Sequence, residues 1–285
     1  MADEYLLYGS WSAGTGTVLL AEGIKESATM DHTLVYQVQN GAWRLQKLVP
    51  WKASGIVIRS DTEILLLGED GEFAVGSGQN YSEGRIAESP TTVGLFNICG
   101  QQYAVGMSSI IYKYRGNMVW DIDIAGIEGE DNDFTCMAGN CDVIYVGGWK
   151  GVCYRRSSLT WHEEILPTNE TLSGMAISED GILLACSING GIVIGREGQW
   201  DIVKHDFPGD SFLGALSYNG KFLLFGQNTV YEVERKEDWQ VTSIYAWPLE
   251  VNGVFSDAFI GESNAIWVLA EDGLFYKGAG DWKML

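Results

Sequence analysis

The sequence has few of the residues on which common protein chemistries depend. Its 285 residues include three histidines and five prolines. It has no GxSxG, Walker-type, HExxH or GxGxxG motif. The acidic segment 128–133 (EGEDND) lacks the spaced ligands and the closing glutamate of an EF-hand loop. We therefore expect a protein that is not an enzyme and that has no cofactor, no metal site and no catalytic residue.

Basic residues are also scarce. The sequence has 18 lysines and arginines and 38 aspartates and glutamates, which gives a formal net charge of −20 at pH 7. A field of this sign repels nucleic acid and anionic membrane surfaces, so we expect neither as a partner. High acidity can serve solubility alone, or it can attract a basic protein.

Long apolar runs and cysteine pairs are missing as well. No stretch approaches 18 consecutive apolar residues, and the start MADEYLLYGSWSAG lacks the features of a signal peptide. The cysteines are odd in number, show no CxxC spacing and lie in or beside apolar runs. We expect buried free thiols and a cytoplasmic location. The cysteines are Cys99, Cys136, Cys141, Cys153 and Cys186.

The sequence does have a repeat marked by aromatic residues. Six tryptophans are separated by 77, 41, 39, 39 and 43 residues, and Tyr81 lies at the middle of the first gap. These spacings predict seven anchors with a period of about 40 residues, which is typical of β-propeller blades. The tryptophan anchors are Trp43, Trp120, Trp161, Trp200, Trp239 and Trp282.

Short apolar strands accompany each anchor. Segments such as EILLLGEDG, VIYVGGWKG and KFLLFGQNT are flanked by further apolar runs and by Gly, Asn, Asp and Ser turns. The first repeat is less regular: its strand TVLLAEG precedes an insertion around residues 24–32, and EYLLYGS is expected to help complete the closing blade.

The predicted fold class is all-β: a seven-bladed propeller with four-stranded antiparallel blades, formed as one domain by residues 1–285. The approximate blade bounds are 1–51, 52–90, 91–126, 127–168, 169–207, 208–247 and 248–285. A parallel β-helix or a pair of β-sandwiches does not explain seven aromatic anchors at one period. Stacked blades bury the faces that a single blade leaves open.

The turns before the anchors resemble a known repeat. RRSSLTW, REGQW, ERKEDW and GAGDW keep the tryptophan of the S-x-D-x-G-x-x-W turn and lose most of its other residues. The chain thus resembles sialidase-type (Asp-box, or BNR) propellers and photosystem-assembly-factor-like propellers over residues 34–285. Sialidase activity would require three arginines that converge on one carboxylate. Five arginines instead fall near third-to-fourth strand turns, opposite the usual active-site face: Arg115, Arg155, Arg156, Arg196 and Arg235.

Two of the three histidines, His162 and His205, follow blade tryptophans at similar distances. We expect them on strand surfaces rather than as catalytic bases.

One face is predicted to be acidic and aromatic. Loops between second and third strands share an edge with loops between blades, and there we expect tryptophans set among carboxylates. Aromatic side chains dominate binding hot spots, and complementary charge accelerates encounter. The alternative is that these tryptophans seal the central channel or pack under loops. The predicted partner-binding residues are Trp51, Glu69, Asp70, Glu128, Glu130, Asp131, Asp133, Trp149, Glu163, Glu164, Asp210, Trp247, Glu271 and Asp272.

These features favour a non-enzymatic protein that binds a basic protein partner and is monomeric alone. An immunity-type inhibitor that caps a basic toxin, such as a nuclease, fits this description, because a nuclease needs positive charge to hold phosphate. An assembly or scaffold factor is the first alternative. A lectin or enzyme with sugars stacked on Trp149 or Trp247 in a central channel is the second.

Overall fold

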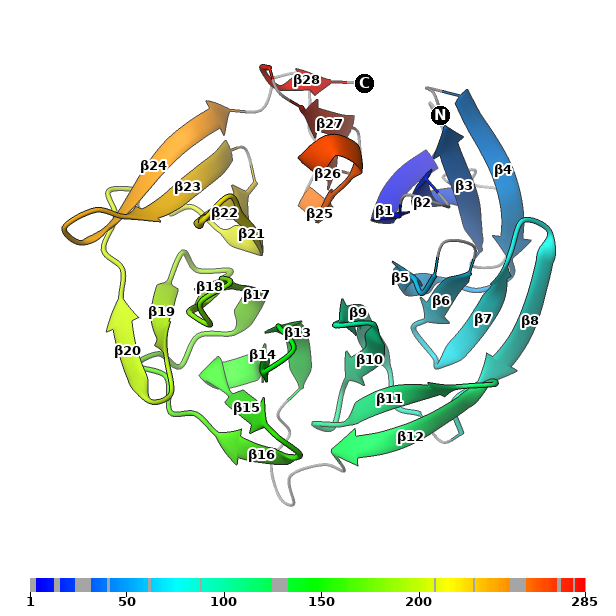
Figure 1. Cartoon of the computed structure of the whole chain (residues 1–285), viewed down its shortest axis with the longest axis horizontal. Coiled ribbons are helices and arrows are strands. Elements are labelled where there is room, and N and C mark those ends of the chain that lie inside the picture. Colours follow the sequence, from blue (N-terminus) through cyan, green and yellow to red (C-terminus); the bar gives the residue numbers. More distant parts are fainter. Residues whose placement is uncertain are drawn as a thin grey trace. The chain divides into compact units, whose positions relative to one another are not determined.

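The computed structural model describes residues 4–12, 16–23, 32–39, 42–60, 63–87, 89–124, 133–207, 209–227, 229–246, 255–270, 273–278 and 280–284. Within these ranges the chain forms seven four-stranded sheets, each made of four consecutive strands (Figure 1). The predicted all-β propeller fold with four-stranded antiparallel blades is confirmed. No described helix is long and apolar enough to cross a membrane.

The strands of the first four sheets follow one another along the chain. They are β1 (Glu4–Ser12), β2 (Gly16–Gly23), β3 (Thr33–Gln39), β4 (Ala42–Val49), β5 (Ala53–Ile58), β6 (Ile64–Gly68), β7 (Glu72–Ser77), β8 (Asn80–Arg85), β9 (Thr92–Ile98), β10 (Gln101–Gly106), β11 (Ile111–Gly116), β12 (Val119–Ile124), β13 (Phe134–Gly139), β14 (Val143–Gly148), β15 (Cys153–Ser157) and β16 (Thr160–Glu163).

The remaining three sheets continue in the same order. Their strands are β17 (Leu172–Ile177), β18 (Leu183–Ser187), β19 (Ile192–Arg196), β20 (Gln199–Ile202), β21 (Phe212–Tyr218), β22 (Lys221–Gly226), β23 (Thr229–Arg235), β24 (Trp239–Ala246), β25 (Phe255–Ile260), β26 (Ile266–Ala270), β27 (Gly273–Lys277) and β28 (Lys283–Met284). Two 3-10 helices, η1 (Trp149–Gly151) and η2 (Glu262–Asn264), complete the described elements.

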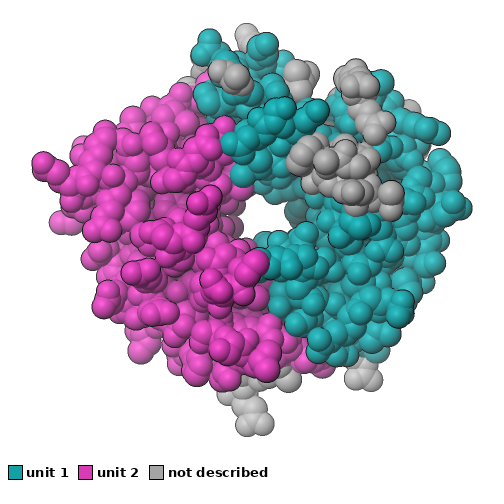
Figure 2. Space-filling view, viewed as in Figure 1, with its two compact units in different colours: residues 1–104, 113–121, 251–285 teal, residues 105–112, 122–250 magenta. Residues whose placement is uncertain are grey.

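The chain divides into two compact units. Unit 1 comprises residues 1–104, 113–121 and 251–285, and unit 2 comprises residues 105–112 and 122–250 (Figure 2). The first and last sheets therefore both belong to unit 1.

The first strand of several sheets carries a β-bulge at the same place. In β5, β13, β17, β21 and β25 the register shifts after the first paired residue. The residue after the bulge is glycine in β5, β17 and β21. A Cβ atom on Gly174 would lie 2.7 Å from the Cα of Gly214, so only glycine lets these two strands approach so closely.

Side chains at the bulge also join neighbouring sheets. The Thr135 hydroxyl donates to the carbonyl of Leu172 over 2.5 Å, and the Ser173 hydroxyl donates to the carbonyl of Phe212 over 2.5 Å. The same repeat position thus connects β13 to β17 and β17 to β21. These bonds fix the loops that enter each first strand.

The predicted aromatic anchors lie between sheets. The indole N–H of Trp161 donates to Asp123, which belongs to the preceding sheet, over 2.9 Å. The ring centroids of Trp200 and Tyr145 are 6.1 Å apart, with the rings edge to face. Trp161 and Trp200 therefore pack against the sheet before their own, in the space between adjacent blades where the repeat places them.

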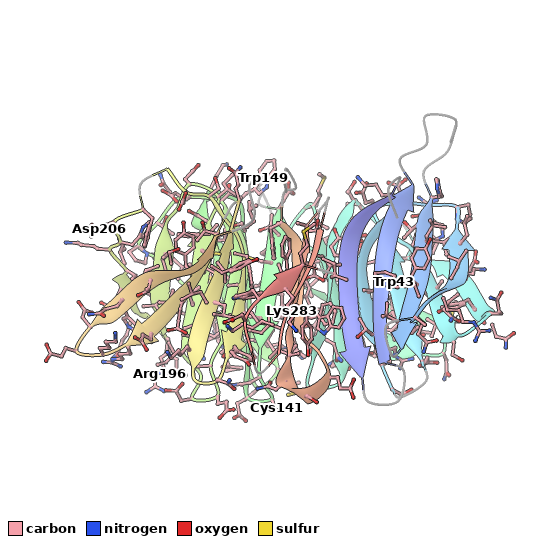
Figure 3. All side chains as sticks on the ribbon, turned by 90° about the horizontal axis from the view of Figure 1, so that it is seen from above. Trp43, Cys141, Trp149, Arg196, Asp206 and Lys283 are labelled. Carbon is pink, nitrogen blue, oxygen red and sulfur yellow. The ribbon has the colours of Figure 1, made fainter. Side chains whose placement is uncertain are left out.

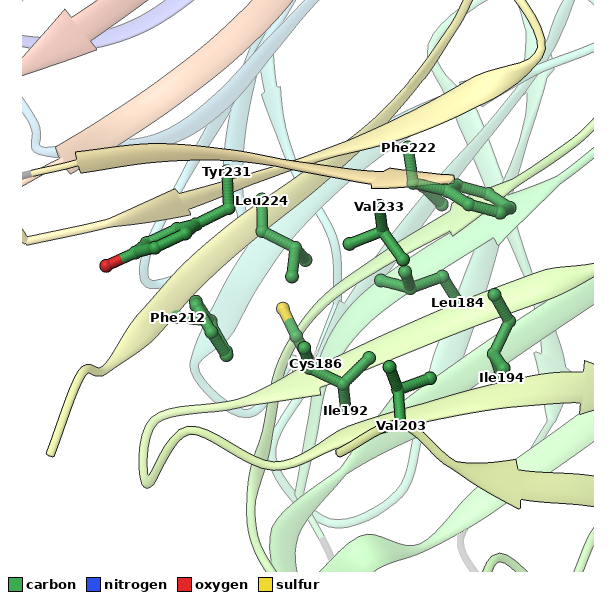
Figure 4. Packing of buried hydrophobic residues seen from close by; sticks show 11 residues of the cluster. Leu184, Cys186, Ile192, Ile194, Val203, Phe212, Phe222, Leu224, Tyr231 and Val233 are labelled. Atoms are coloured by element: carbon green, nitrogen blue, oxygen red, sulfur yellow. The ribbon is translucent and has the colours of Figure 1, made fainter. Parts of the chain in front are cut away.

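Aliphatic and aromatic side chains fill the space between the sheets. One buried cluster lies between the fifth and sixth sheets (Figure 4). Every buried Leu, Ile or Phe side chain removed from water contributes roughly 1.5–3 kcal/mol. The cluster comprises Ala176, Leu184, Cys186, Ile192, Ile194, Val203, Phe212, Phe222, Leu224, Tyr231 and Val233.

The last sheet is completed by the chain's own C-terminal strand. β28 pairs with β27, and β1 pairs with β2 as the first strand of the first sheet. The expectation that EYLLYGS completes the closing blade is therefore wrong, because two residues of Lys283–Met284 suffice as a fourth strand. The predicted strand TVLLAEG is confirmed within β2, and the insertion at residues 24–31 lies outside the described residues.

The cysteines fall into two groups. Cys136, Cys153 and Cys186 are free and buried. Burial raises the pKa of the Cys136 and Cys186 thiols to about 12. Cys99 and Cys141 are disulfide-bonded and exposed on the β9–β10 and β13–β14 turns, so the prediction of five buried free thiols is wrong for these two residues.

Candidate partner-binding site

One edge of unit 2 brings together loops of the kind predicted to bind a partner. In an antiparallel meander, the turn between the second and third strands lies at the same edge as the loop that enters the first strand. Figure 3 shows Trp149 and Asp206 toward this edge, and Arg196 and Cys141 toward the opposite one. We call this edge the loop face of unit 2. It comprises residues 107–110, 133, 149–151, 164–171, 188–191, 203–207 and 209–211.

Trp149 is the exposed aromatic residue of this face. It begins η1, and 45% of its surface is exposed. The backbone N–H of Trp149 donates to the backbone carbonyl of Asp133 over 3.0 Å. The Asp133 carboxylate accepts a hydrogen bond from the N–H of Ser108, also over 3.0 Å. Asp133 therefore joins the turn that carries Trp149 to the β10–β11 turn.

Glu170 makes a second connection on the loop face. Its carboxylate accepts a hydrogen bond from the Ser187 hydroxyl, and its N–H donates to the Thr168 hydroxyl over 3.2 Å. The Ser187 hydroxyl also accepts the N–H of Gly191 over 2.8 Å. The loop that enters β17 is thereby held against the β18–β19 turn.

A third connection involves Asp210 and His205. The Tyr231 hydroxyl donates to the Asp210 carboxylate. The Nε2 atom of His205 lies 2.8 Å from the Gly190 carbonyl, and its ring stacks on Phe207 with centroids 6.0 Å apart. His205 is therefore in the loop after β20 and not on a strand surface, whereas His162 lies exposed on β16 as predicted.

Glu164 does not offer its carboxylate to a partner, so its prediction as a binding residue is wrong. It is 7% exposed, and its Oε1 atom accepts from Nε of Arg155 over 2.7 Å. Its Oε2 atom accepts from the N–H of Gly198 over 2.9 Å. The neighbouring Glu163 is exposed. Strand alternation sends these two side chains in different directions, and loop sequence alone did not reveal which one faces solvent.

The other described candidates are divided between the two units. Asp133 and Asp210, both half-buried, lie in unit 2 and carry the connections above. In unit 1, Trp51 packs half-buried against the core cluster of the β5–β6 region, as the alternative interpretation predicted. Glu69 Oε1 lies 3.0 Å from Lys52 Nζ, and Asp70 is exposed. The predicted residues Glu128, Glu130, Asp131, Trp247, Glu271 and Asp272 lie outside the described residues.

The arginines near third-to-fourth strand turns support the sheets. Arg156 Nη1 lies 3.6 Å from the carboxylate of Asp123, and its guanidinium stands 5.9 Å from the ring centre of Trp161. Arg235 stands 5.8 Å from the ring centre of Trp239. A basic residue four or five positions before an anchor thus contacts that anchor's ring, which gives these arginines a structural role.

Sequence reasoning missed three exposed apolar residues of the loop face, one of which is Ile165, 84% exposed in the loop that enters β17. Met107 is 40% exposed in the β10–β11 turn, and Ile188 is 44% exposed in the β18–β19 turn. Each of these two lies between the second and third strands of its sheet, as Trp149 does. Aligning the repeats at this turn would have found them.

The described residues contain no group of three or more His, Cys, Asp or Glu side chains placed to hold a metal ion. The chemistry available on the loop face is therefore that of apolar contact, hydrogen bonding and carboxylate charge.

The fold and the loop face of unit 2 together define a propeller with an exposed surface of apolar and acidic loop residues.

No known family model matches the chain. It is 27% identical to Immune protein Tsi7 of Pseudomonas aeruginosa over 221 residues, which cover 70% of this chain and 72% of that protein.

Solved structures show the same fold at lower identity. A streptogramin B lyase structure superimposes with a TM-score of 0.74 at 13% identity and covers 100% of this chain and 95% of that chain. YCF48 from Cyanidioschyzon merolae has a TM-score of 0.72 at 13% identity, with 97% of this chain and 96% of that chain covered. YCF48 bound to D1 peptide has a TM-score of 0.71 at 14% identity, with 98% and 93% covered. These comparisons show the propeller fold and no sialidase-type motif.

Proposed function

We propose that this protein is an immunity-type protein, which binds a protein toxin and blocks it without chemistry of its own. The observation that carries the proposal is the 27% identity to Immune protein Tsi7 over 221 residues. An inhibitor of this type works by covering a surface, so it needs a firm exposed face rather than a catalytic arrangement. The hydrogen-bonded loop face of unit 2 supplies such a face.

The proposed partner is a basic protein, and a nuclease is its best-fitting class. The net charge of −20 attracts a cationic surface and steers it during diffusion. A nuclease concentrates positive charge where it holds phosphate, so an acidic cap both accelerates encounter and occupies the substrate site. Among the predicted residues of unit 2, Trp149 and Glu163 are exposed and are the proposed contact positions.

A cytoplasmic, monomeric protein remains part of the proposal. The three free thiols agree with a reducing compartment. The disulfide-bonded Cys99 and Cys141 count against it, because disulfides are rare in the cytosol.

Co-expression tests the proposed function. The polypeptide encoded by the gene beside this one is produced in a heterologous bacterium, alone and together with this protein. We expect growth arrest in the first case and growth in the second. A harmless neighbouring product, or an arrest that persists while both proteins are soluble, would contradict the proposal.

An assembly or scaffold factor is the alternative function, and the fold shared with YCF48 favours it. The two functions differ in what they require of the partner. A scaffold binds several components of one complex and does not relieve toxicity. An immunity-type protein forms a complex with one toxin, and its effect on growth follows the affinity of that complex.

A further inference from the structure

We propose that Met107, Trp149 and Ile188 form one apolar row that docks a cationic segment of the toxin, with an apolar side chain of that segment seated on Trp149. This inference rests on the proposed function and adds the surface that performs it. The row belongs entirely to unit 2.

The three residues occupy one repeat position. Each lies in the turn between the second and third strands of its sheet, and the three sheets are consecutive in the chain. Their exposed fractions are 40%, 45% and 44%. The fold could have placed polar residues at these turns, because a second-to-third strand turn needs no apolar side chain for packing. Repeated exposure of large apolar residues at one place marks an interaction surface.

Hydrogen bonds and one close backbone contact connect the loops that carry the row. Ser108, next to Met107, donates to Asp133, whose carbonyl accepts the N–H of Trp149. At the far end of η1, a Cβ atom on Gly151 would collide with the carbonyl of Thr168, so the two loops are in contact.

The contacts continue from Thr168 to the last member of the row. Thr168 accepts the N–H of Glu170, and Glu170 accepts the hydroxyl of Ser187, which precedes Ile188. Met107, Trp149 and Ile188 are therefore carried by loops that contact one another, through hydrogen bonds at both ends and through the close approach of Gly151 to Thr168 in the middle.

The turn that carries Trp149 is fixed before a partner arrives. Lys150 adopts a left-handed φ of 55°, and the N–H of Val152 donates to the carbonyl of Trp149 over 3.1 Å. The N–H of Gly148 donates to the carbonyl of Val152 over 3.0 Å. A preorganised turn loses little conformational entropy on binding, which favours Trp149 as the anchor of the interface.

The charges beside the row define the partner. Glu170, Asp206 and Asp210 lie on the loops of the same face that enter β17 and β21, and the described cations of this face are Lys150 and Lys204. The Asp133 carboxylate accepts the N–H of Ser108, next to Met107, and is a fourth carboxylate of this face. Apart from the buried Glu164, which is paired with Arg155, this face has these four carboxylates and two ammonium groups, an excess of negative charge that favours lysine or arginine on the partner and disfavours nucleic acid. The occupant is thus a protein segment with an apolar residue flanked by basic ones.

Calorimetric titration with the purified neighbouring-gene product tests the row. The variants are Trp149→Ala and the double change Met107→Ser with Ile188→Ser. The matched control is Leu159→Ser: Leu159 is 83% exposed, but it lies in the β15–β16 turn at the opposite edge. We expect Trp149→Ala to weaken binding by at least about tenfold, the double variant by a comparable factor and the control by less than about twofold.

The results separate the two proposals. A wild-type protein that does not bind the product overturns the proposed function and the row with it. Wild-type binding that both row variants retain overturns the row alone and moves the contact to another face. Thermal melting of each variant tests whether a loss of affinity comes from unfolding, and we expect unchanged melting temperatures because all four substituted positions are exposed.

Discussion

The backbone N–H of Gly9 donates a hydrogen bond of 2.9 Å to Oδ2 of Asp257, although the two residues are 248 positions apart. Asp257 follows the bulge in β25, where β5, β17 and β21 have glycine, and its Oδ1 accepts the N–H of Ala258 over 2.8 Å. Gly9 lies in β1. A carboxylate therefore joins the last sheet to the first within unit 1.

This carboxylate makes stability depend on pH. Desolvation raises the pKa of Asp257 from 3.8 to about 7. Because the folded pKa lies above the unfolded one, the contribution of Asp257 to stability is fully present below pH 3.8 and is lost as pH rises through 7. Burial, followed by the negative charge of Asp257, raises the pKa of Tyr8 in β1 to about 12. We expect Asp257→Asn to flatten the decline of Tm between pH 5 and 8.

The control for this change is Asp206→Asn, at an exposed position of the loop face. The melting temperature of this variant should follow wild type across the same pH range. An Asp257→Asn variant whose pH profile parallels that of wild type would refute the assignment.

Two anchor tryptophans differ in whether the indole N–H has a hydrogen-bond partner. The Trp161 N–H donates to Asp123, whereas the Nε1 atom of Trp200 is buried with no hydrogen-bond partner. Trp161→Phe removes a bond to a charged acceptor, and Trp200→Phe removes only ring volume. We expect the first change to lower the free energy of unfolding by about 1–2 kcal/mol more than the second, measured by urea denaturation. Equal losses would show that the bond contributes nothing.

Substitutions of two neighbouring glutamates, Glu163 and Glu164, are expected to differ widely in their effect on stability. Glu164→Ala leaves Arg155, which is 18% exposed in its side chain, with only the carboxylate of Glu197 at 3.6 Å. Removing one member of a buried pair costs about 3–5 kcal/mol, so we expect a clear fall in Tm. Glu163→Ala, at the adjacent exposed position, should change the free energy of unfolding by less than about 0.5 kcal/mol. If both variants melt alike, the Arg155–Glu164 pair is not a structural contact.

Thiol titration tests the state of the cysteines. Protein purified without reductant and then unfolded should react through three thiols, because Cys136, Cys153 and Cys186 are free while Cys99 and Cys141 are bonded. The folded protein should react slowly, since burial raises the pKa of Cys136 and Cys186 to about 12 and lowers the thiolate fraction. Five reactive thiols without added reductant would show that Cys99 and Cys141 are reduced.

The sequence predicted the parts of the fold that recur. Aromatic anchors at a regular spacing, such as Trp161 and Trp200, identified the four-stranded repeat because their bulk is needed once per sheet. The chain ends were harder to predict. Lys283–Met284 is too short to be recognised as a strand, yet pairing with β27 is enough to define it.

The candidate site was predictable only in outline. Trp149 and Glu163 are exposed, but Glu164, the next residue after Glu163, is buried. The local sequence does not distinguish the two adjacent glutamates. The partner Arg155 lies on a neighbouring strand, so the outcome depends on pairing register. Cys99 and Cys141 were misjudged because neighbouring apolar strands hid the exposed turns on which they lie.

The contact between the first and last sheets also bears on how the chain is made. Tyr36, Val38 and Trp43 pack against Phe259, Trp267, Leu269 and Leu274. During synthesis from the N-terminus, the first sheet emerges from the ribosome long before the residues that cover this apolar surface. The apolar side chains of the first sheet therefore stay uncovered until the intervening sheets and the last sheet have been translated. This surface is therefore one that a chaperone of nascent chains can bind before the last sheet covers it.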